Sequence, residues 1–519
     1  MSEAILQPVG AGFSRLNPPE GGSHIAIAAA QPIWIVAALL AVSAPLYFMR
    51  GIGVFDDSLH LKIGQLILDG FVPYRDFYDN KPPGLYYVSA AIAAIGGRGW
   101  LAPRIFLFLF AAVFQVGVIR WLQRRFGTRA SIFAAIFFGL SYPLGQGYSL
   151  HTEQFGSAAA FLACAVILAE VPSTRRWAFA GALLGLSTVF KQTGVLYLAA
   201  FLMFAVLDAK RRNTGARAVV TLSALCGGFA AVLAIVTIPF VAKGLARPLF
   251  DAVVFGAANR ADFPFQSWYG IAHTWVLSPA LIACLGIVVV HVLSRRARRA
   301  MDEDRRRAFG LFMFVGIFSL VPTLKEGWVG HYVQPGAFAF SAACAVYLDA
   351  YLKEEGWQAR LVTAATFSGM AAYFVALGAV NGDLLRQNRI GADLQVQHQI
   401  RQTLDARLDA DAPVLCVSGP STARLYLMSG RRPFNRSLYF YPSNDWLFSI
   451  NDARRVLFDG RAEAAVVEIN PADDRPVLTD PEVASLKSLY DVVPVGPQVP
   501  LRLIALFRQP VGDSGRPTW

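Results

Sequence analysis

Long apolar runs separated by short polar loops fill the first three quarters of the chain, and they stop near Val380. A helix that crosses a bilayer needs about 20 predominantly apolar residues. The pattern therefore predicts about eleven membrane-spanning helices. The expected spans cover residues 32–49, 103–122, 131–148, 152–169, 177–190, 193–208, 218–241, 273–294, 308–323, 331–350 and 360–380.

Two apolar stretches fit this pattern less simply. Segment 84–95 is too short to span, and we expect it to lie in the membrane interface or to dip into the membrane. The 177–208 region is interrupted near Lys191, so two short spans or one broken span are both open. A single span would move the arginine-rich loop 295–307 to the outer side, which the distribution of loop charges disfavours.

The tail, residues 381–519, lacks such runs and is long enough to form a small domain. Its pattern alternates between helical and strand-like spacing. We expect helices at 394–404, 451–458 and 481–490, and strands at 414–418, 464–469 and 501–507. The predicted fold class is a polytopic α-helical membrane protein with a small α/β domain: a cytoplasmic lead at 1–31, a membrane body at 32–380 and the α/β domain at 381–519.

Composition supports this class, because 55% of the residues are hydrophobic, only 16% are charged and the mean hydropathy is +0.44. The formal charge of +12 comes with no nucleic-acid motif. If the amino terminus is cytoplasmic, the inner loops hold 19 lysines and arginines, whereas the short outer loops hold only Lys191 and Lys325. This asymmetry predicts a multi-pass protein of the inner membrane whose first loop and tail face outward. The five scattered cysteines form no metal or disulfide pattern, and we expect them to be buried small side chains.

The first outer loop, residues 50–84, concentrates five aspartates between two apolar segments. From Asp56 to Gly70 the apolar residues follow one helical face, which predicts an amphipathic helix along the membrane surface. A single aspartate at its start is explained as an N-cap. Asp56 and Asp57 are adjacent, so one can cap while the other faces a pocket.

Five more ionisable residues lie near the outer ends of spans. Lys81 precedes a Pro-Pro pair and could bind a phosphate, or it could extend to the interface. His151 and Glu153 could hold a metal or a polar substrate, or cap the fourth span. Lys191 and His331 lie at the ends of later spans. The charge count places all of them on one side of the membrane, and ionisable residues at a membrane favour a functional site.

Several motifs resemble a known superfamily. An acid pair follows the first span, and G-x-x-P-Y-R-D-F-x-D-x-K-P-P follows at 70–83, with F-K-Q-T-G at 190–194 and H-Y-x-x-P at 331–335. Over residues 30–350 the chain resembles the GT-C glycosyltransferases, in particular the dolichyl-phosphate-mannose protein mannosyltransferases and the lipid A aminoarabinose transferases. The resemblance implies an inverting enzyme that moves a hexose or pentose from a polyprenyl phosphate to an envelope lipid, polysaccharide or protein on the outer face.

The resemblance also implies roles for individual residues. The family pair is usually Asp-Glu, whereas this chain has Asp-Asp, which leaves the second acid and any divalent cation open. The implied base is Asp56 with Asp57 as second acid; the donor phosphate would meet Lys81, Lys191 and His331; His151 and Glu153 would hold acceptor or metal; and Tyr74, Arg75, Asp76 and Asp79 complete the first-loop motif.

Two other classes of protein stay open. A transporter or flippase for lipid-linked sugars would need the same apolar body, although such proteins usually show repeats and sites at the middle of the membrane. An assembly protein whose tail binds a partner would make the acidic loop incidental. The pattern identifies neither the sugar nor the acceptor.

Overall fold

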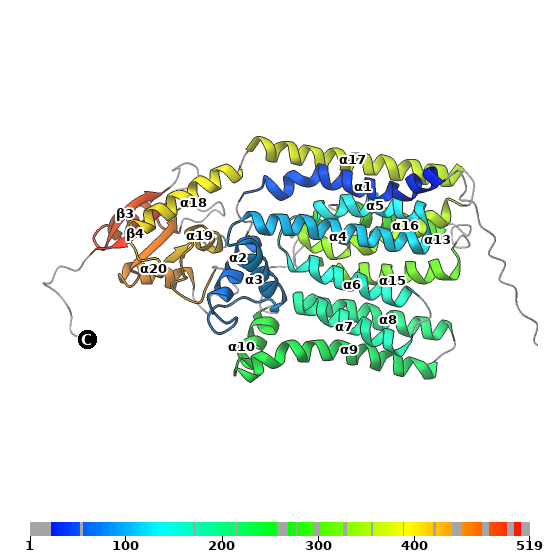
Figure 1. The fold of residues 1–519 in the computed structure, drawn as a ribbon, viewed down its shortest axis with the longest axis horizontal. Helices are drawn as coiled ribbons and strands as arrows, with labels where there is room; N and C mark the ends of the chain where they lie inside the picture. Colours follow the sequence, from blue (N-terminus) through cyan, green and yellow to red (C-terminus); the bar gives the residue numbers. More distant parts are fainter. Residues whose placement is uncertain are drawn as a thin grey trace, which may run out of the picture.

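The computed structural model describes residues 22–51, 55–169, 173–212, 215–256, 268–276, 278–293, 301–324, 330–353, 357–387, 389–418, 422–438, 449–469, 477–495 and 503–509. Long helices form a bundle, and a smaller part with a β-sheet lies at one end of it (Figure 1). The helices of the first outer loop lie between the two.

The bundle contains the predicted membrane body. Within the described residues, seven helical segments are long and apolar enough to cross a membrane. Helices also form at the predicted spans 131–148, 177–190, 273–294 and 331–350, but they are not among those seven, so the count of eleven stays a prediction. The bundle helices are α1 (Gly22–Phe48), α4 (Leu101–Phe126), α5 (Thr128–Leu144), α6 (Thr152–Ala169), α7 (Thr174–Phe190), α8 (Val195–Arg211), α9 (Gly215–Ala242), α12 (Trp268–Val276), α13 (Pro279–Leu293), α15 (Glu303–Ser319), α16 (Gln334–Tyr351) and α17 (Trp357–Gln387).

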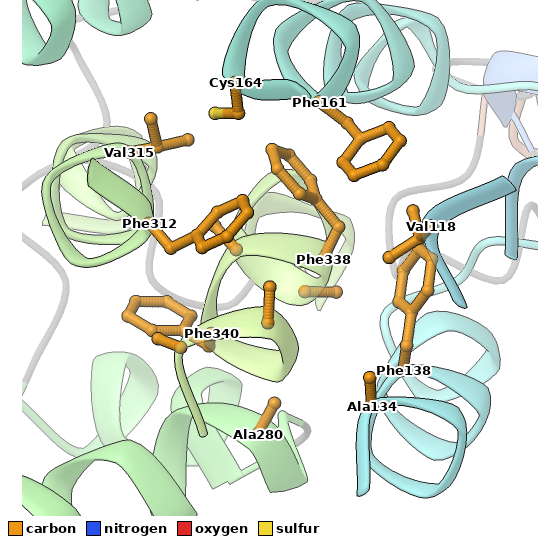
Figure 2. Close-up of a cluster of buried hydrophobic side chains, with 14 of the residues drawn as sticks. Val118, Ala134, Phe138, Phe161, Cys164, Ala280, Phe312, Val315, Phe338 and Phe340 are labelled. Atoms are coloured by element: carbon orange, nitrogen blue, oxygen red, sulfur yellow. The ribbon is translucent and has the colours of Figure 1, made fainter. Parts of the chain in front are cut away.

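Helix α16 forms the centre of the bundle and is buried along its whole length. Its sequence is rich in alanine, which lets neighbouring helices approach closely. In Figure 2, Phe338 and Phe340 of α16 lie among side chains from several surrounding helices. Four of the five cysteines are buried as expected, whereas Cys226 on α9 is exposed.

The region left ambiguous by the sequence is broken at Lys191. Helix α7 ends at Phe190, a 3-10 turn follows at Gln192–Gly194, and α8 begins at Val195. The two helices contact each other and lie side by side in Figure 1. The chain therefore forms two short helices here rather than one continuous span.

The first outer loop forms two helices, α2 (Phe55–Leu68) and α3 (Gly84–Gly96), which pack together. The predicted amphipathic helix is confirmed, with Leu59, Ile63 and Leu66 buried. It is more enclosed than a helix lying on a membrane surface, because its polar residues His60 and Lys62 are buried as well. The tail, residues 381–519, covers the side of α2 on which Lys62 lies.

The tail forms a four-stranded sheet with the order β1-β2-β4-β3, in which β1 and β2 are parallel and the other pairs are antiparallel. The predicted helix at 481–490 is partly wrong, because it ends at Leu486 and an unpredicted edge strand begins at Tyr490. Pro494 weakened the sequence signal for a strand at this position, although an edge strand tolerates proline. The elements are α18 (Arg389–Asp405), β1 (Leu415–Val417), α19 (Thr422–Ser429), α20 (Ile450–Phe458), β2 (Ala464–Glu468), α21 (Asp480–Leu486), β3 (Tyr490–Val495) and β4 (Leu503–Arg508).

Direct hydrogen bonds join the tail to the first outer loop. The Lys62 ammonium donates to the backbone carbonyl of Arg431 at 2.7 Å. The Arg436 guanidinium donates to the carbonyl of Tyr74 at 2.7 Å, and the Tyr78 amide donates to the carbonyl of Arg436 at 3.1 Å. The tail therefore fixes the loop from the side opposite the bundle.

Candidate functional site

The first turn of α2 places Asp56 at the centre of a buried charged cluster. One carboxylate oxygen accepts a hydrogen bond from the Lys81 ammonium at 2.8 Å, and the other lies 3.1 Å from Nδ1 of His151. Burial alone would favour the neutral acid, but Lys81 and His151 outweigh it and hold the pKa of Asp56 well below its usual range. Asp56 is therefore an ionised carboxylate with a cationic partner.

Lys81 is held in place through its own backbone. Its carbonyl accepts hydrogen bonds from the hydroxyls of Tyr74 at 2.7 Å and Tyr86 at 2.9 Å. Tyr86 also lies 2.8 Å from a carboxylate oxygen of Asp79. Tyr74 has a φ of 66°, which is uncommon for a residue with a side chain. Two residues of the first-loop motif, Tyr74 and Asp79, therefore position Lys81.

The other two motif residues lie away from the cluster. Arg75 and Asp76 pair with each other at 2.7 Å on the surface, and Asp76 also accepts from the amide of Val72 at 2.7 Å. The Arg75 guanidinium lowers the pKa of Asp76. This pair closes the turn and does not reach Asp56.

Asp57 points away from Asp56, so the two acids are separated. One Asp57 oxygen accepts from the backbone amide of Leu150, and the other lies 3.3 Å from the Arg104 guanidinium. Its exposed fraction is 3%. Asp57 therefore anchors the loop that presents His151.

His60 belongs to the site although the sequence reasoning did not select it. Its Nδ1 lies 2.9 Å from the carbonyl of Leu150, which assigns the proton to Nδ1, and its Nε2 faces Lys81 at 3.4 Å. Burial, followed by the charge of Lys81, lowers the pKa of His60 to about 4, so the ring is neutral at pH 7. Its spacing of four residues from Asp56 places both on one helical face, and that spacing was the available signal.

A second ion pair lies beside the first. Glu153, in the first turn of α6, accepts a hydrogen bond from the Lys191 ammonium and lies 3.4 Å from Nε2 of His331. The Lys191 ammonium also lies 4.0 Å from the centre of the Tyr332 ring. The rings of His331 and His151 stack with centres 4.1 Å apart, so they connect the two ion pairs.

The same cluster contains one candidate metal site. Ligand atoms of Asp56, His151 and His331 all lie within 4.8 Å of one another. Nε2 of His151 is buried and has no hydrogen-bond partner among the described residues. Burial and the neighbouring His151 keep the pKa of His331 well below its usual value, so its ring is neutral, as a metal ligand must be. One carboxylate and two imidazoles fit a divalent cation such as zinc. Glu153 is not among these three ligands, and both carboxylates are engaged by a lysine, Asp56 by Lys81 and Glu153 by Lys191.

An apolar groove begins beside Lys81. A cavity of about 640 Å³ adjoins Pro82 and Pro83 and extends between α7, α9 and a short helical segment at 246–255. Its walls include Val189, Leu233 and Leu249. A side chain at Gly84 would lie 2.7 Å from the carbonyl of Val189, so glycine permits the contact that brings the Lys81 loop against α7. The groove can therefore hold a long apolar chain whose polar end reaches Lys81.

Comparison with known proteins identifies the fold of the chain. Residues 80–241 match the family described as dolichyl-phosphate-mannose-protein mannosyltransferase. ArnT from Cupriavidus metallidurans bound to undecaprenyl phosphate is similar with a TM-score of 0.64 and 13% identity over 96% of this chain and 100% of that chain. The oligosaccharyltransferase AglB from Archaeoglobus fulgidus, in complex with an inhibitory peptide and a dolichol-phosphate, gives a TM-score of 0.53 and 12% identity over 85% of this chain and 69% of that chain. A search of the curated proteins found no match.

Proposed function

We propose that this chain, which has the fold of the GT-C glycosyltransferases, is an inverting transferase that moves a sugar from a polyprenyl phosphate to a cell-envelope acceptor. One observation carries the proposal: a buried Asp56–Lys81 ion pair lies at the end of an apolar groove. The relatives of known structure support it, because ArnT was solved with undecaprenyl phosphate and AglB with a dolichol-phosphate.

The donor would bind with its prenyl chain in the groove and its phosphate at the lysines. Lys81 is adjacent in sequence to Pro82, which lines the groove. A prenyl chain bound in the groove would therefore place its phosphate close to the Lys81 ammonium. Lys191 and His331 lie beside this pair, where both contact Glu153. They would add a second ammonium and an imidazole around the donor phosphate. A lysine binds a phosphate as a point charge, which suits a leaving group whose charge grows during the reaction.

The reaction would be one displacement at the anomeric carbon. The acceptor hydroxyl or amine attacks that carbon, Asp56 takes the proton of the nucleophile, and the bond to the phosphate oxygen breaks. The phosphate already leaves as a stable anion, so no acid has to protonate it. A single displacement inverts the configuration of the anomeric carbon.

The resting ion pair would couple donor binding to the base. While Lys81 holds Asp56, the carboxylate has a low pKa and is a weak base. A phosphate that attracts Lys81 would weaken this contact and restore the basicity of Asp56. Asp56 would therefore become an effective base only when the donor is present.

The neighbouring residues would support these two groups. Asp57 and His60 would position the loop of His151 through Leu150. Glu153 would orient Lys191 and, with His151, would lie at the entrance for the acceptor. If a divalent cation takes part, Asp56, His151 and His331 would be its ligands. The cation would then supply a further positive charge for the phosphate.

The finer features of the protein are proposed with the function. The body would have eleven spans with the lead inside, and the active site and the α/β tail would lie on the outer side of the inner membrane. The acceptor would be lipid A or another lipopolysaccharide component, a polysaccharide or a protein.

Incubating the purified protein with a panel of polyprenyl-phosphate sugars and an envelope extract tests the function. We expect one donor to be consumed and free polyprenyl phosphate to appear, and an Asp56→Asn control to show neither. Movement of an intact lipid-linked sugar across proteoliposomes, without cleavage of any donor, would instead identify a flippase and overturn the proposal.

A further inference from the structure

A second groove lies at the opposite end of the bundle from Asp56. It runs between the carboxyl-terminal half of α8 and residues 306–317 of α15 and encloses about 280 Å³. Its walls are mostly apolar, with Phe204 and Leu207 on α8 and Met313, Phe314 and Ile317 on α15. Both helices are among the segments able to cross a membrane, and Leu207 and Ile317 in the groove walls are exposed large hydrophobic residues, as expected of a surface that meets lipid.

The groove is cationic where α8 ends and α15 begins. Arg211, Arg306 and Arg307 line it, and Asp208 is the acidic residue among them. Asp208 is shared, because it lies 3.3 Å from Arg307 and 3.4 Å from Arg212 outside the groove lining. The groove therefore has an excess of positive charge at one end.

Arg307 shares its anionic partner, because its Nε lies 3.3 Å from Asp208, which also faces Arg212. The exposed fraction of Arg307 is 8%, and one of its terminal nitrogens has neither a hydrogen bond nor an ion pair among the described residues. A buried guanidinium with unpaired N–H groups is costly unless a ligand completes its hydrogen bonds. Arg211, at the end of α8, forms no ion pair within the described part of the chain, so no carboxylate there balances its charge.

The groove has the length of part of an acyl chain. Positions 307 and 317 are ten residues apart on α15, which corresponds to about 15 Å along a helix. Gly310 lies between them, and a side chain added there would meet no atom within 4 Å. The missing side chain keeps the groove open between the arginines and Ile317.

We propose that this groove binds an anionic phospholipid. The phosphate would accept hydrogen bonds from Arg307 and its neighbours, and one acyl chain would lie along Met313 and Ile317. Charge complementarity selects this occupant, because a zwitterionic lipid adds no net charge against the excess of arginines, and basic pockets between membrane helices recognise anionic headgroups. The site is separate from the sugar-transfer site, and its test does not depend on the proposed function.

Native mass spectrometry of the full chain released from nanodiscs tests the proposal. Nanodiscs would contain equal amounts of phosphatidylglycerol and phosphatidylcholine, and bound lipid would be counted for the parent, for two test variants and for two control variants. The parent should retain phosphatidylglycerol selectively. Arg211→Gln should lower its affinity about fivefold, the usual effect of one cation near a lipid surface.

Gly310→Leu should fill the groove and reduce retention of phosphatidylglycerol to the level of phosphatidylcholine. Gly117→Leu on α4 is the matched control, because Gly117 likewise lies in a helix and has open space at its Cβ. Arg124→Gln, at the exposed end of α4, controls for loss of one positive charge. Equal retention of both lipids by the parent would overturn the proposal, and so would equal retention by Gly310→Leu and Gly117→Leu.

Discussion

Replacing Asp56 with asparagine should strongly slow sugar transfer and at the same time tighten the binding of polyprenyl phosphate. In the resting site the Lys81 ammonium is bound to Asp56 at 2.8 Å, and both side chains are almost fully buried. A phosphate must compete with this carboxylate for Lys81 and is also repelled by it. Asparagine keeps a hydrogen-bond acceptor at the same place but carries no charge, so Lys81 becomes available.

The magnitude follows from the contact that is exchanged. A hydrogen bond to a charged group contributes about 1.5–3 kcal/mol, which corresponds to about a tenfold to hundredfold change in affinity. Asp56→Asn should therefore lower the dissociation constant of polyprenyl phosphate by about this factor. The rate of transfer should fall by about 10² to 10⁴, the usual contribution of a positioned base.

Lys81→Met separates this explanation from a general change in the site. It should weaken binding of polyprenyl phosphate by a similar factor, because the cation itself is lost. In the double variant, Asp56→Asn should no longer tighten binding, since no ammonium remains to be released. Affinity would be measured by titration of the purified protein in detergent, with thermal unfolding recorded in the same preparation.

Two results would refute the reasoning. If Asp56→Asn binds polyprenyl phosphate no more tightly than the parent while remaining folded, Lys81 is not the group that receives the phosphate. If the variant transfers sugar at the parental rate, Asp56 is not the base.

Three further predictions concern parts of the chain around this site. Burial lowers the pKa of Lys62 from 10.5 to about 8, so above about pH 8 the unfolded chain binds more protons than the folded one. The free energy of unfolding should therefore rise by up to about 3 kcal/mol between pH 8 and 10, seen as a higher melting temperature. A Lys62→Met variant that keeps this rise would contradict the assignment. Asp57→Asn should slow transfer less than Asp56→Asn but lower stability by about 1–3 kcal/mol, because the amide of Leu150 loses a charged acceptor; unchanged thermal unfolding would argue against an anchoring role. Alkaline phosphatase should be active when fused after residue 385 and inactive when fused after Arg299, and the reverse pattern would rule out the eleven-span topology.

The sequence predicted which residues share the site better than how they are paired. Asp56, Lys81, His151, Glu153, Lys191 and His331 all lie in one cluster, although the first and last are far apart in the chain. The loop charges were sufficient for this, because residues at the outer ends of neighbouring spans must meet at one level of the bundle.

The pairing depends on the rotation of each helix about its axis, which an apolar pattern does not encode when every face is buried. Adjacent residues Asp56 and Asp57 point about 100° apart on α2, so one meets Lys81 and the other meets Arg104. The buried position of His60 was missed for the same reason. In the tail, β3 was missed because its local sequence resembles the end of a helix followed by a turn at Pro494, and only pairing with β4 makes it a strand.

The balance of charge in the cluster explains how Asp56 can be an ionised, weakly basic carboxylate at rest and a stronger base when the donor is bound. Two carboxylates, Asp56 and Glu153, face two ammonium groups, Lys81 and Lys191, while His60 and His331 are kept neutral by burial. Each carboxylate is therefore matched by one ammonium, which lowers the cost of burying these two ion pairs. A donor phosphate adds one negative charge to this balance, and the added charge raises the affinity of Asp56 for a proton. In the proposed reaction the acceptor hydroxyl or amine supplies that proton as it attacks, so the charge added by the donor would favour the first step of the transfer.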